Sequence, residues 1–193
     1  MIGEVDAIVL AGGRGSRLGA PSKPDFVLRG RRLLDVALAA VASARRVVVV
    51  GPGPVPDGVL LTREDPPYGG PVEAVLAGYV ALPDHAVWTI LLACDLPGAE
   101  AGVQRLLGAS PDDSVDGVCL VDGDERAQWL LGCYRTEALS RRLASRGEPP
   151  LTAMHQLLSP LRLLLVPAEP GLTDDVDTPE DAARWARRQE DHR

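Results

Sequence analysis

Short, almost unbroken apolar runs recur along the chain, and segments of helical periodicity alternate with them. The clearest runs are residues 5–10, 46–50 and 87–93, with a shorter one at 58–62. Helices are expected at residues 33–44, 71–81 and 99–107. Strands that read as continuous apolar runs are typical of parallel sheets, whose two faces are both covered by helices. The sequence therefore predicts an α/β fold with a mostly parallel, mixed sheet, helices on both faces, and residues 87–93 at its centre.

The pattern changes after residue 108. Residues 118–121 and 128–134 are expected to form a hairpin, because Asp122-Gly123 is a turn signal between them. Further elements are predicted in this order: helices at 137–145 and 152–158, a strand at 162–166, and a last helix that begins at Thr178-Pro179. Because no linker or repeat divides the chain, residues 1–193 are predicted to form a single domain.

A glycine-rich, basic loop follows the first apolar run. Residues 9–23 read Val-Leu-Ala-Gly-Gly-Arg-Gly-Ser-Arg-Leu-Gly-Ala-Pro-Ser-Lys, and Lys23 is the only lysine in the protein. Such a loop can bring backbone N–H groups and positive charge against phosphates. Its spacing fits neither of the two commonest phosphate loops. G-x-G-x-x-G from Gly13 would need glycine where Leu18 stands, and the P-loop order Gly-Lys-Ser/Thr is absent.

Charge and cysteine usage narrow the function classes. A net charge of −7 argues against a nucleic-acid binder. Eight basic residues nevertheless lie between Arg14 and Arg46, against only Asp25 and Asp35, which favours a small anionic ligand. Three cysteines sit inside apolar runs and are interpreted as buried, reduced thiols. No leader or membrane-spanning run is seen, so a cytoplasmic protein without a membrane partner is expected.

Four stretches in order resemble the molybdenum cofactor guanylyltransferases, the MobA family of nucleotidyltransferases. The first, residues 10–19 with Lys23, resembles the signature of the wider group that shares the glycosyltransferase-A-like, Rossmann-like α/β fold. The others are residues 65–78 with Gly69-Gly70-Pro71, Ala93-Cys-Asp-Leu-Pro97, and Asp175-Val-Asp-Thr-Pro-Glu-Asp181. This resemblance implies transfer of GMP from GTP to a molybdopterin-bound molybdenum cofactor with release of pyrophosphate. It also implies transient contact with cofactor-handling proteins.

Roles for single residues follow from the resemblance and from their chemistry. The nucleotide is expected to bind backbone groups of the loop and a carboxylate at Asp65, which suits the N–H edge of guanine; the loop residues are Leu10, Ala11, Gly12 and Gly13. Arg17 and Lys23 are predicted catalytic groups that neutralise the triphosphate and the leaving pyrophosphate. A solvated loop is the alternative for both.

Asp95 ends a very apolar strand, where a carboxylate needs a partner. It is the predicted catalytic ligand for Mg²⁺, with capping of the helix at 99–107 as the alternative. Asp177 is a candidate second metal ligand or a cap for the last helix. Gly69, Gly70 and Pro71, with Trp129, are assigned to the acceptor; Trp129 otherwise belongs to the core. Residues 1–108 are expected to bind the nucleotide and residues 109–193 the acceptor.

Three departures from the family pattern leave alternatives open. Gly51 stands where the family tends to carry Asn, Asp177 where it often has Asn, and the Gly19–Lys23 spacing is one residue longer. A nucleotidyltransferase that uses CTP or another acceptor is one alternative. A non-catalytic nucleotide-binding module in cofactor assembly is the other.

Overall fold

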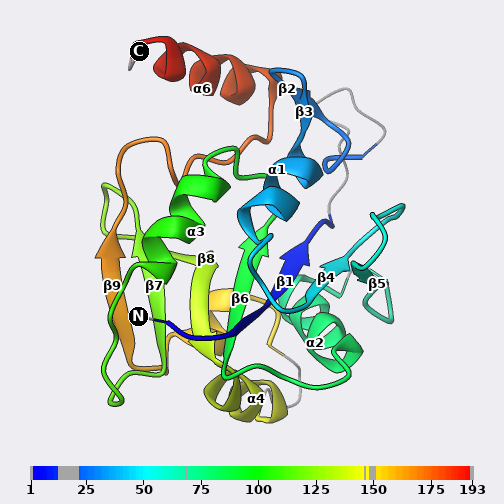
Figure 1. Cartoon of the computed structure of the whole chain (residues 1–193), viewed down its shortest axis with the longest axis vertical. Helices are drawn as coiled ribbons and strands as arrows, with labels where there is room; N and C mark the ends of the chain where they lie inside the picture. The colour runs from blue at the N-terminus through cyan, green and yellow to red at the C-terminus, as the bar shows by residue number, and fades with distance from the viewer. Residues whose placement is uncertain (1, 13–21, 68, 146, 148–150, 192–193) are drawn as a thin grey trace.

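A seven-stranded sheet organises the chain in the computed structural model, which describes residues 2–12, 22–67, 69–145, 147 and 151–191 (Figure 1). Its strand order is β5-β4-β1-β6-β8-β7-β9. The strands are β1 (Val5–Leu10), β4 (Val47–Val50), β5 (Leu60–Thr62), β6 (Trp88–Ala93), β7 (Gly117–Val121), β8 (Ala127–Arg135) and β9 (Leu163–Pro167). The central position predicted for residues 87–93 is confirmed, since β6 is the fourth strand of seven.

The sheet is mixed in the predicted way. β5, β4, β1 and β6 run parallel to one another, whereas β8 is antiparallel to both β6 and β7. The predicted hairpin is β7–β8, and the Asp122 carboxylate accepts hydrogen bonds from the backbone N–H groups of Asp124 and Arg126 in its turn, each at 2.9 Å. β9 returns parallel to β7 at the sheet edge. Strands from both halves of the chain therefore share one sheet.

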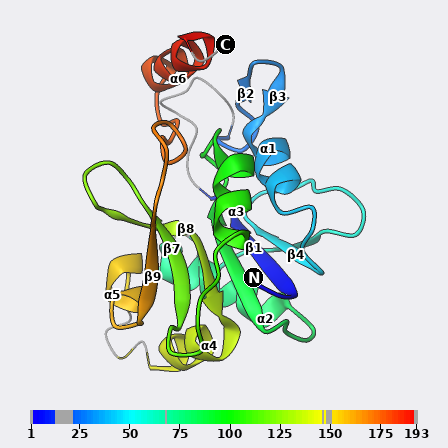
Figure 2. The same cartoon turned by 60° about the vertical axis from the view of Figure 1, so that its left-hand side comes forward.

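Helices cover both faces of the sheet. α1 (Leu33–Ala40) and α3 (Ala99–Leu107) pack on one face, in a core with side chains from β1, β6 and β8. α2 (Pro71–Ala81), α4 (Thr136–Ala144) and α5 (Met154–Leu158) pack on the other. The remaining elements lie past the carboxyl ends of β1 and β6 (Figures 1 and 2); they are α6 (Pro179–Asp191), β2 (Val27–Leu28) and β3 (Arg31–Arg32).

Two segments differ from the sequence prediction. The helix expected at 33–44 ends at Ala40, because the N–H groups of Ala42 and Ala44 bond to carbonyls three residues back and tighten the chain into turns. The β2–β3 hairpin has no alternating apolar signal in its two-residue strands. It forms around Arg29 and Gly30, both at positive φ, and pairs Val27 with Arg32.

Polar groups pin the ends of several elements. Asp6 is fully buried in β1, and its carboxylate accepts two hydrogen bonds from the Arg45 guanidinium, at 3.1 and 3.0 Å, and one from the Ala86 N–H at 2.6 Å. These bonds satisfy a charge that would otherwise be costly to bury.

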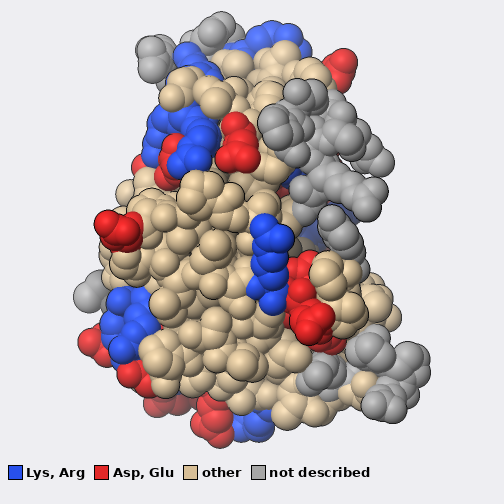
Figure 3. Space-filling model, turned by 90° about the vertical axis from the view of Figure 1, so that its right-hand side faces the viewer, with Lys and Arg blue, Asp and Glu red and all other residues tan. Residues whose placement is uncertain are grey.

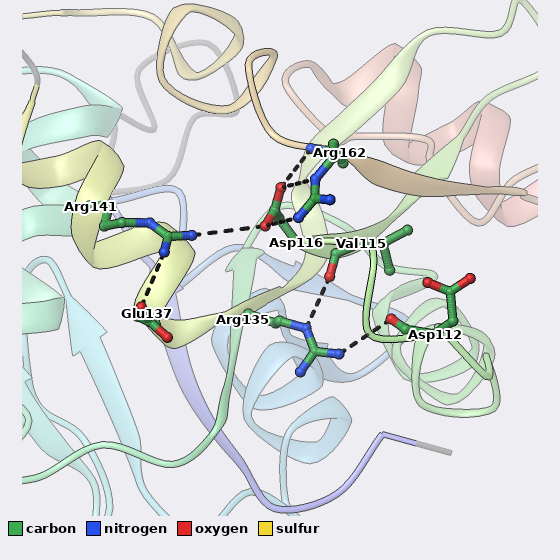
Figure 4. Close-up of polar contacts among 7 residues, drawn as sticks. All are labelled: Asp112, Val115, Asp116, Arg135, Glu137, Arg141 and Arg162. Carbon is green, nitrogen blue, oxygen red and sulfur yellow. Dashed lines mark hydrogen bonds and ion pairs between the residues drawn. The ribbon is translucent and has the colours of Figure 1, made fainter.

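A second network lies at the amino ends of β7 and β9 (Figure 4). The Asp116 carboxylate accepts bonds from the backbone N–H and guanidinium of Arg162 and lies 4.0 Å from the guanidinium of Arg141 on α4. Arg135 donates to the Val115 carbonyl at 2.9 Å and stacks over Trp88. The network thus joins β7, β8, β9 and α4.

The face that carries β5 and α2 has few charged side chains across its middle (Figure 3). Exposed apolar residues on these elements are Leu60, Leu61 and Val80. Within the described residues, no helix combines the length and the apolar character needed to cross a membrane.

The three cysteines are buried free thiols, as predicted. Cys94 directly follows β6, Cys119 lies on β7 and Cys133 on β8. Burial raises the pKa of all three thiols, to about 11 for Cys119 and about 12 for Cys133. Because the thiolate is the reactive form, these groups are shielded both by packing and by protonation.

The native protein should therefore resist thiol reagents. At pH 8 we expect 5,5′-dithiobis(2-nitrobenzoate) to modify the folded protein at least ~100-fold more slowly than the protein in 6 M guanidinium chloride. All three thiols should react after unfolding. Rapid release of one equivalent of chromophore from the native protein would show that a thiol is accessible and activated.

Candidate active site

One lysine joins two acidic residues from distant parts of the chain. The Lys23 ammonium lies 2.6 Å from the Asp95 carboxylate and also contacts the Asp177 carboxylate. The side chains of Lys23 and Asp95 are 12% and 21% exposed, whereas that of Asp177 is 48% exposed. The structure thus brings together three of the residues that the sequence predicted for the site.

The carboxyl edge of the parallel strands positions Asp95. Asp95 follows Cys94 at the end of β6, and the Cys94 N–H donates to the Leu10 carbonyl of β1 at 3.0 Å. The Asp95 backbone carbonyl accepts a hydrogen bond from the Val176 N–H at 3.0 Å. That bond places Asp177, the next residue, beside Asp95. Open α/β sheets bind their ligands at this edge.

A small hydrophobic cluster holds Lys23 and Asp177 on the same side. Leu33 and Val176 are fully buried in it, with Ala182 of α6, and Phe26 and Leu28 pack against them. The backbone also anchors the lysine segment, since the Phe26 N–H donates to the Lys23 carbonyl and the Leu34 N–H to that of Pro24. Burial of these apolar side chains therefore fixes the segments that carry Lys23 and Asp177, whose side chains form the ion pair.

The alternative roles considered for the two aspartates are not observed. α3 begins after Gly98 and has no side-chain cap, so Asp95 does not cap it. At α6, Thr178 and Asp181 form a reciprocal capping box: the Asp181 N–H donates to the Thr178 hydroxyl, and the Thr178 N–H donates to the Asp181 carboxylate. The Asp177 carboxylate is directed to Lys23 instead.

The electrostatics of the cluster favour a bound cation. Burial alone would lower the pKa of Lys23, but the attraction of Asp95 and Asp177 outweighs it and the pKa is raised. Asp175, two residues before Asp177, has a raised pKa because of partial burial and because of the negative charges of Asp177 and Asp95. Asp175 was not among the residues predicted for the site, although it lies in the same sequence motif. The carboxylates of Asp95, Asp175 and Asp177 outnumber the single Lys23 ammonium, so this region carries an excess of negative charge.

Asp95 and Asp177 could hold a divalent cation. Both carboxylates already share one positive charge, the Lys23 ammonium, so their oxygens converge on a common point. Within the described residues, no group of three or more His, Cys, Asp or Glu side chains is arranged to hold a metal alone. Two carboxylates suit Mg²⁺, which takes most of its other ligands from water and substrate phosphates.

A hollow of about 360 Å³ opens beside Asp95. It is mostly apolar, and its lining residues are Leu10, Gly12, Glu64, Gly70, Pro71, Ala74, Ala93, Asp95 and Leu130. Ala11 is fully buried next to it, and its N–H donates to the Val50 carbonyl at 2.9 Å. The hollow therefore contains predicted nucleotide-binding and acceptor-binding residues together.

The start of α2 forms one wall of this hollow. Gly70 is the N-cap, at a φ of 94° that favours glycine, and Pro71 is the first helical residue, as predicted. Gly69 precedes them. Trp129 is half-buried on β8 and packs against the core under α2 and α4, whereas the hollow is lined by the next residue, Leu130. An acceptor role for Trp129 therefore stays a prediction.

Asp65 lies elsewhere. It is exposed and lines a separate hollow with Glu73 and Val80 on the outer side of α2. The half-buried residue before it, Glu64, reaches the hollow of Asp95 instead. Of this acidic pair, the sequence predicts only Asp65 to bind the nucleotide and does not identify Glu64. Arg17 and Gly13 lie outside the described residues, so their roles also stay predictions.

Gly51 is fixed by the packing of the loop. A Cβ atom at this residue would stand 2.6 Å from the Ala11 carbonyl oxygen and 2.7 Å from its carbon. The residue also has a φ of +154°, which L-amino acids rarely adopt. A side chain such as Asn at this position therefore requires a different path of residue 11.

We expect Gly51→Ala to destabilise the fold by about 2 kcal/mol, because the new methyl group must displace backbone at the start of the loop. Urea unfolding measures this change. Gly123→Ala is the matched control, since a Cβ there meets nothing within 4 Å. Equal stability of the two variants would contradict the close packing of residues 11 and 51.

Comparison with known proteins supports the architecture. A molybdenum cofactor guanylyltransferase from Serratia proteamaculans is 25% identical over 94% of each chain. One from Acidiphilium cryptum is 34% identical over 54% of this chain and 57% of its own length. The structure of molybdopterin-guanine dinucleotide biosynthesis protein A from Archaeoglobus fulgidus superposes with a TM-score of 0.70 and 16% identity, over 96% of this chain and 99% of that one.

The family model for the MobA-like NTP transferase domain matches residues 7–162. This range includes the glycine-rich loop, Lys23, Asp95 and the strands of the sheet from Ala7 of β1 to the end of β8. The predicted nucleotidyltransferase fold is confirmed, and the chain belongs to the MobA-like NTP transferase family of nucleotidyltransferase enzymes.

Proposed function

We propose that this enzyme transfers GMP from GTP to the phosphate of a molybdopterin-bound molybdenum cofactor and releases pyrophosphate. The observation that carries the proposal is the Lys23–Asp95–Asp177 cluster beside a mostly apolar hollow, in a member of this family. We infer the substrates from the names of the two relatives, both of which are molybdenum cofactor guanylyltransferases. The hollow suits a flat base, and the cluster suits the phosphates.

The reaction needs no covalent intermediate. A phosphate oxygen of the acceptor attacks the α-phosphorus of GTP in line, a new P–O bond forms, and the bond to the β-phosphate breaks as pyrophosphate leaves with its electron pair. Lys23 contributes the positive charge of its ammonium, which lies between Asp95 and Asp177, and this charge stabilises the leaving group. We assign the same role to Arg17. Leu10 to Gly13 present backbone groups to the nucleotide.

Asp95 and Asp177 are the residues that would hold Mg²⁺. When bound, the ion would neutralise phosphate charge and orient the reacting phosphates. The two carboxylates that share the Lys23 ammonium fit such an ion in charge and donor type.

We assign nucleotide binding to residues 1–108 and acceptor binding to residues 109–193, with Gly69-Gly70-Pro71 at the boundary between the two ligands. Asp177 is the exception, because it lies in the second half of the chain but belongs to the nucleotide side of the site. The enzyme would meet its acceptor on cofactor-handling proteins in the cytoplasm, where its three free thiols stay reduced.

Pyrophosphate release tests the proposal. The wild type with GTP, Mg²⁺ and the molybdopterin acceptor should release pyrophosphate, and ATP, UTP or CTP in place of GTP should give little. Asp95→Asn should abolish turnover while part of the GTP binding survives. A higher rate with CTP would establish the cytidylyl alternative, and no release with any nucleotide would favour a non-catalytic binding module.

Lys23→Ala separates catalysis from stability. We expect turnover to fall at least ~100-fold, because a charge that acts on the leaving group is lost. The free energy of unfolding should fall by about 1–3 kcal/mol, because Asp95, whose side chain is 21% exposed, loses its charged hydrogen-bond partner.

Arg46→Ala is the control for the loss of an ion-paired cation, because Arg46 pairs with Asp84 away from the site. Steady-state kinetics and urea unfolding provide the two measurements. A Lys23→Ala enzyme that loses stability and activity in proportion would contradict a catalytic role.

A further inference from the structure

We propose that the buried hydroxyl of Tyr134 positions a ledge of β8, residues 128–130, and that this ledge receives the flat ring of the acceptor beside the hollow that contains Asp95. The assignment of the acceptor rests on the proposed function, whereas the role of Tyr134 in holding the ledge does not. Tyr134 is a positioning residue. Its side chain is fully buried, so it acts through the backbone of the ledge and not by contact with a substrate.

A change of register on β8 creates the ledge. The pairs of β7 and β8 residues on either side of the change are Cys119–Gly132 and Val121–Ala127. Leu120 of β7 therefore stands opposite the four residues 128–131 of β8. On the other side of β8, the pairing with β6 ends at Leu131. Such an irregularity re-aims side chains, and irregularities of this kind are frequent next to active sites.

The irregularity turns two consecutive side chains toward one face of the sheet. Trp129 and Leu130 both pack against the core under α2 and α4, although neighbours on a regular strand point to opposite faces. Leu130 also lines the hollow that contains Asp95. Both side chains are half-buried, so part of their apolar surface stays open to a ligand. Aromatic and aliphatic side chains at the wall of a pocket suit a flat heterocyclic ring.

The Tyr134 hydroxyl holds the ledge from inside the core. It donates a hydrogen bond of 2.8 Å to the Trp129 carbonyl, five residues back on the same strand. The tyrosine side chain can lie along the strand because residue 132 is glycine: a Cβ atom there would stand 2.5 Å from the hydroxyl oxygen. The Cys119 Sγ atom, at 3.9 Å, makes a longer contact with the same oxygen. Burial raises the pKa of Tyr134, so the hydroxyl remains a donor.

The other end of the ledge is fixed by the β7–β8 turn. The Gln128 side chain donates to the Asp122 carboxylate at 2.9 Å, and that carboxylate also accepts two backbone bonds within the turn. The ledge is thus held at Gln128 by a polar contact near solvent and at Trp129 by a bond from the core. Removal of the Tyr134 hydroxyl would leave the Trp129 carbonyl without this donor and release one end of the ledge.

Hydrogen–deuterium exchange tests whether Tyr134 holds the ledge. Tyr134→Phe removes only the hydroxyl and keeps the ring that fills the core. We expect the amides of residues 127–131 to exchange at least ~10-fold faster in this variant, measured by mass spectrometry, because local opening of the ledge becomes easier.

Thr89→Val is the matched control. Thr89 is the partner of Tyr134 in the β6–β8 pairing, and its buried hydroxyl bonds to that of Thr136 at 2.8 Å. The control therefore loses a buried hydroxyl in the same region and keeps the bond to Trp129. Its ledge should exchange within about twofold of the wild-type rate.

Steady-state kinetics tests the assignment of the acceptor. At saturating GTP, Tyr134→Phe should raise the KM for the molybdopterin acceptor at least ~5-fold, with kcat within about twofold of the wild type. The Kd of GTP with Mg²⁺, measured by isothermal titration calorimetry without acceptor, should change by less than about twofold, because the Lys23 cluster is untouched. Thr89→Val should leave all three constants unchanged.

Four outcomes would contradict the inference. Unchanged exchange of residues 127–131 in Tyr134→Phe overturns the positioning role, and so does equally fast exchange in Thr89→Val, which would indicate a general loss of stability. Faster exchange in Tyr134→Phe with equal losses of GTP and acceptor affinity overturns the assignment of the acceptor. A wild type that releases no pyrophosphate contradicts the proposed function and that assignment, while the exchange comparison still decides the role of Tyr134.

Discussion

The sharing of one ammonium between two carboxylates is the interaction around which the functional half of this molecule is arranged. Lys23 contacts Asp95 and Asp177, which lie 72 and 154 residues further along the chain. Each of the three side chains comes from a different segment, so the pairing requires that the sheet, the β2–β3 hairpin and the segment before α6 are all in place. Lys23 therefore neutralises only part of the negative charge in this region before any substrate arrives.

Apolar burial and a backbone hydrogen bond make this arrangement possible. Leu33 and Val176 fill a small core past the sheet edge, and the Val176 N–H bonds to the Asp95 carbonyl. Exposed ion pairs contribute little by themselves. Stability instead comes from the two main cores, one of which extends to the hollow of the site through Leu10 and Ala74.

The sequence predicts most of the fold because its strands are apolar runs and its helices have clear starts, such as Pro71 and Thr178-Pro179. It does not predict β2–β3, because Arg31 and Arg32 carry no strand pattern and the hairpin depends on Arg29 and Gly30 at positive φ. Within the site, a carboxylate at the end of an apolar strand, such as Asp95, can be recognised from the sequence. The presence of Glu64 rather than Asp65 in the lining of the hollow beside Asp95 cannot, because it depends on the tertiary packing of the segment after β5.

The contact between Gly51 and Ala11 couples two positions that sequence comparison would treat as independent. A Cβ at residue 51 would stand 2.6 Å from the Ala11 carbonyl oxygen, so the identity of one position constrains the backbone path of the other. Efforts to redesign base selectivity by grafting an amide side chain onto position 51 must therefore rebuild the first turn of the glycine-rich loop as well. The two positions therefore have to be engineered together.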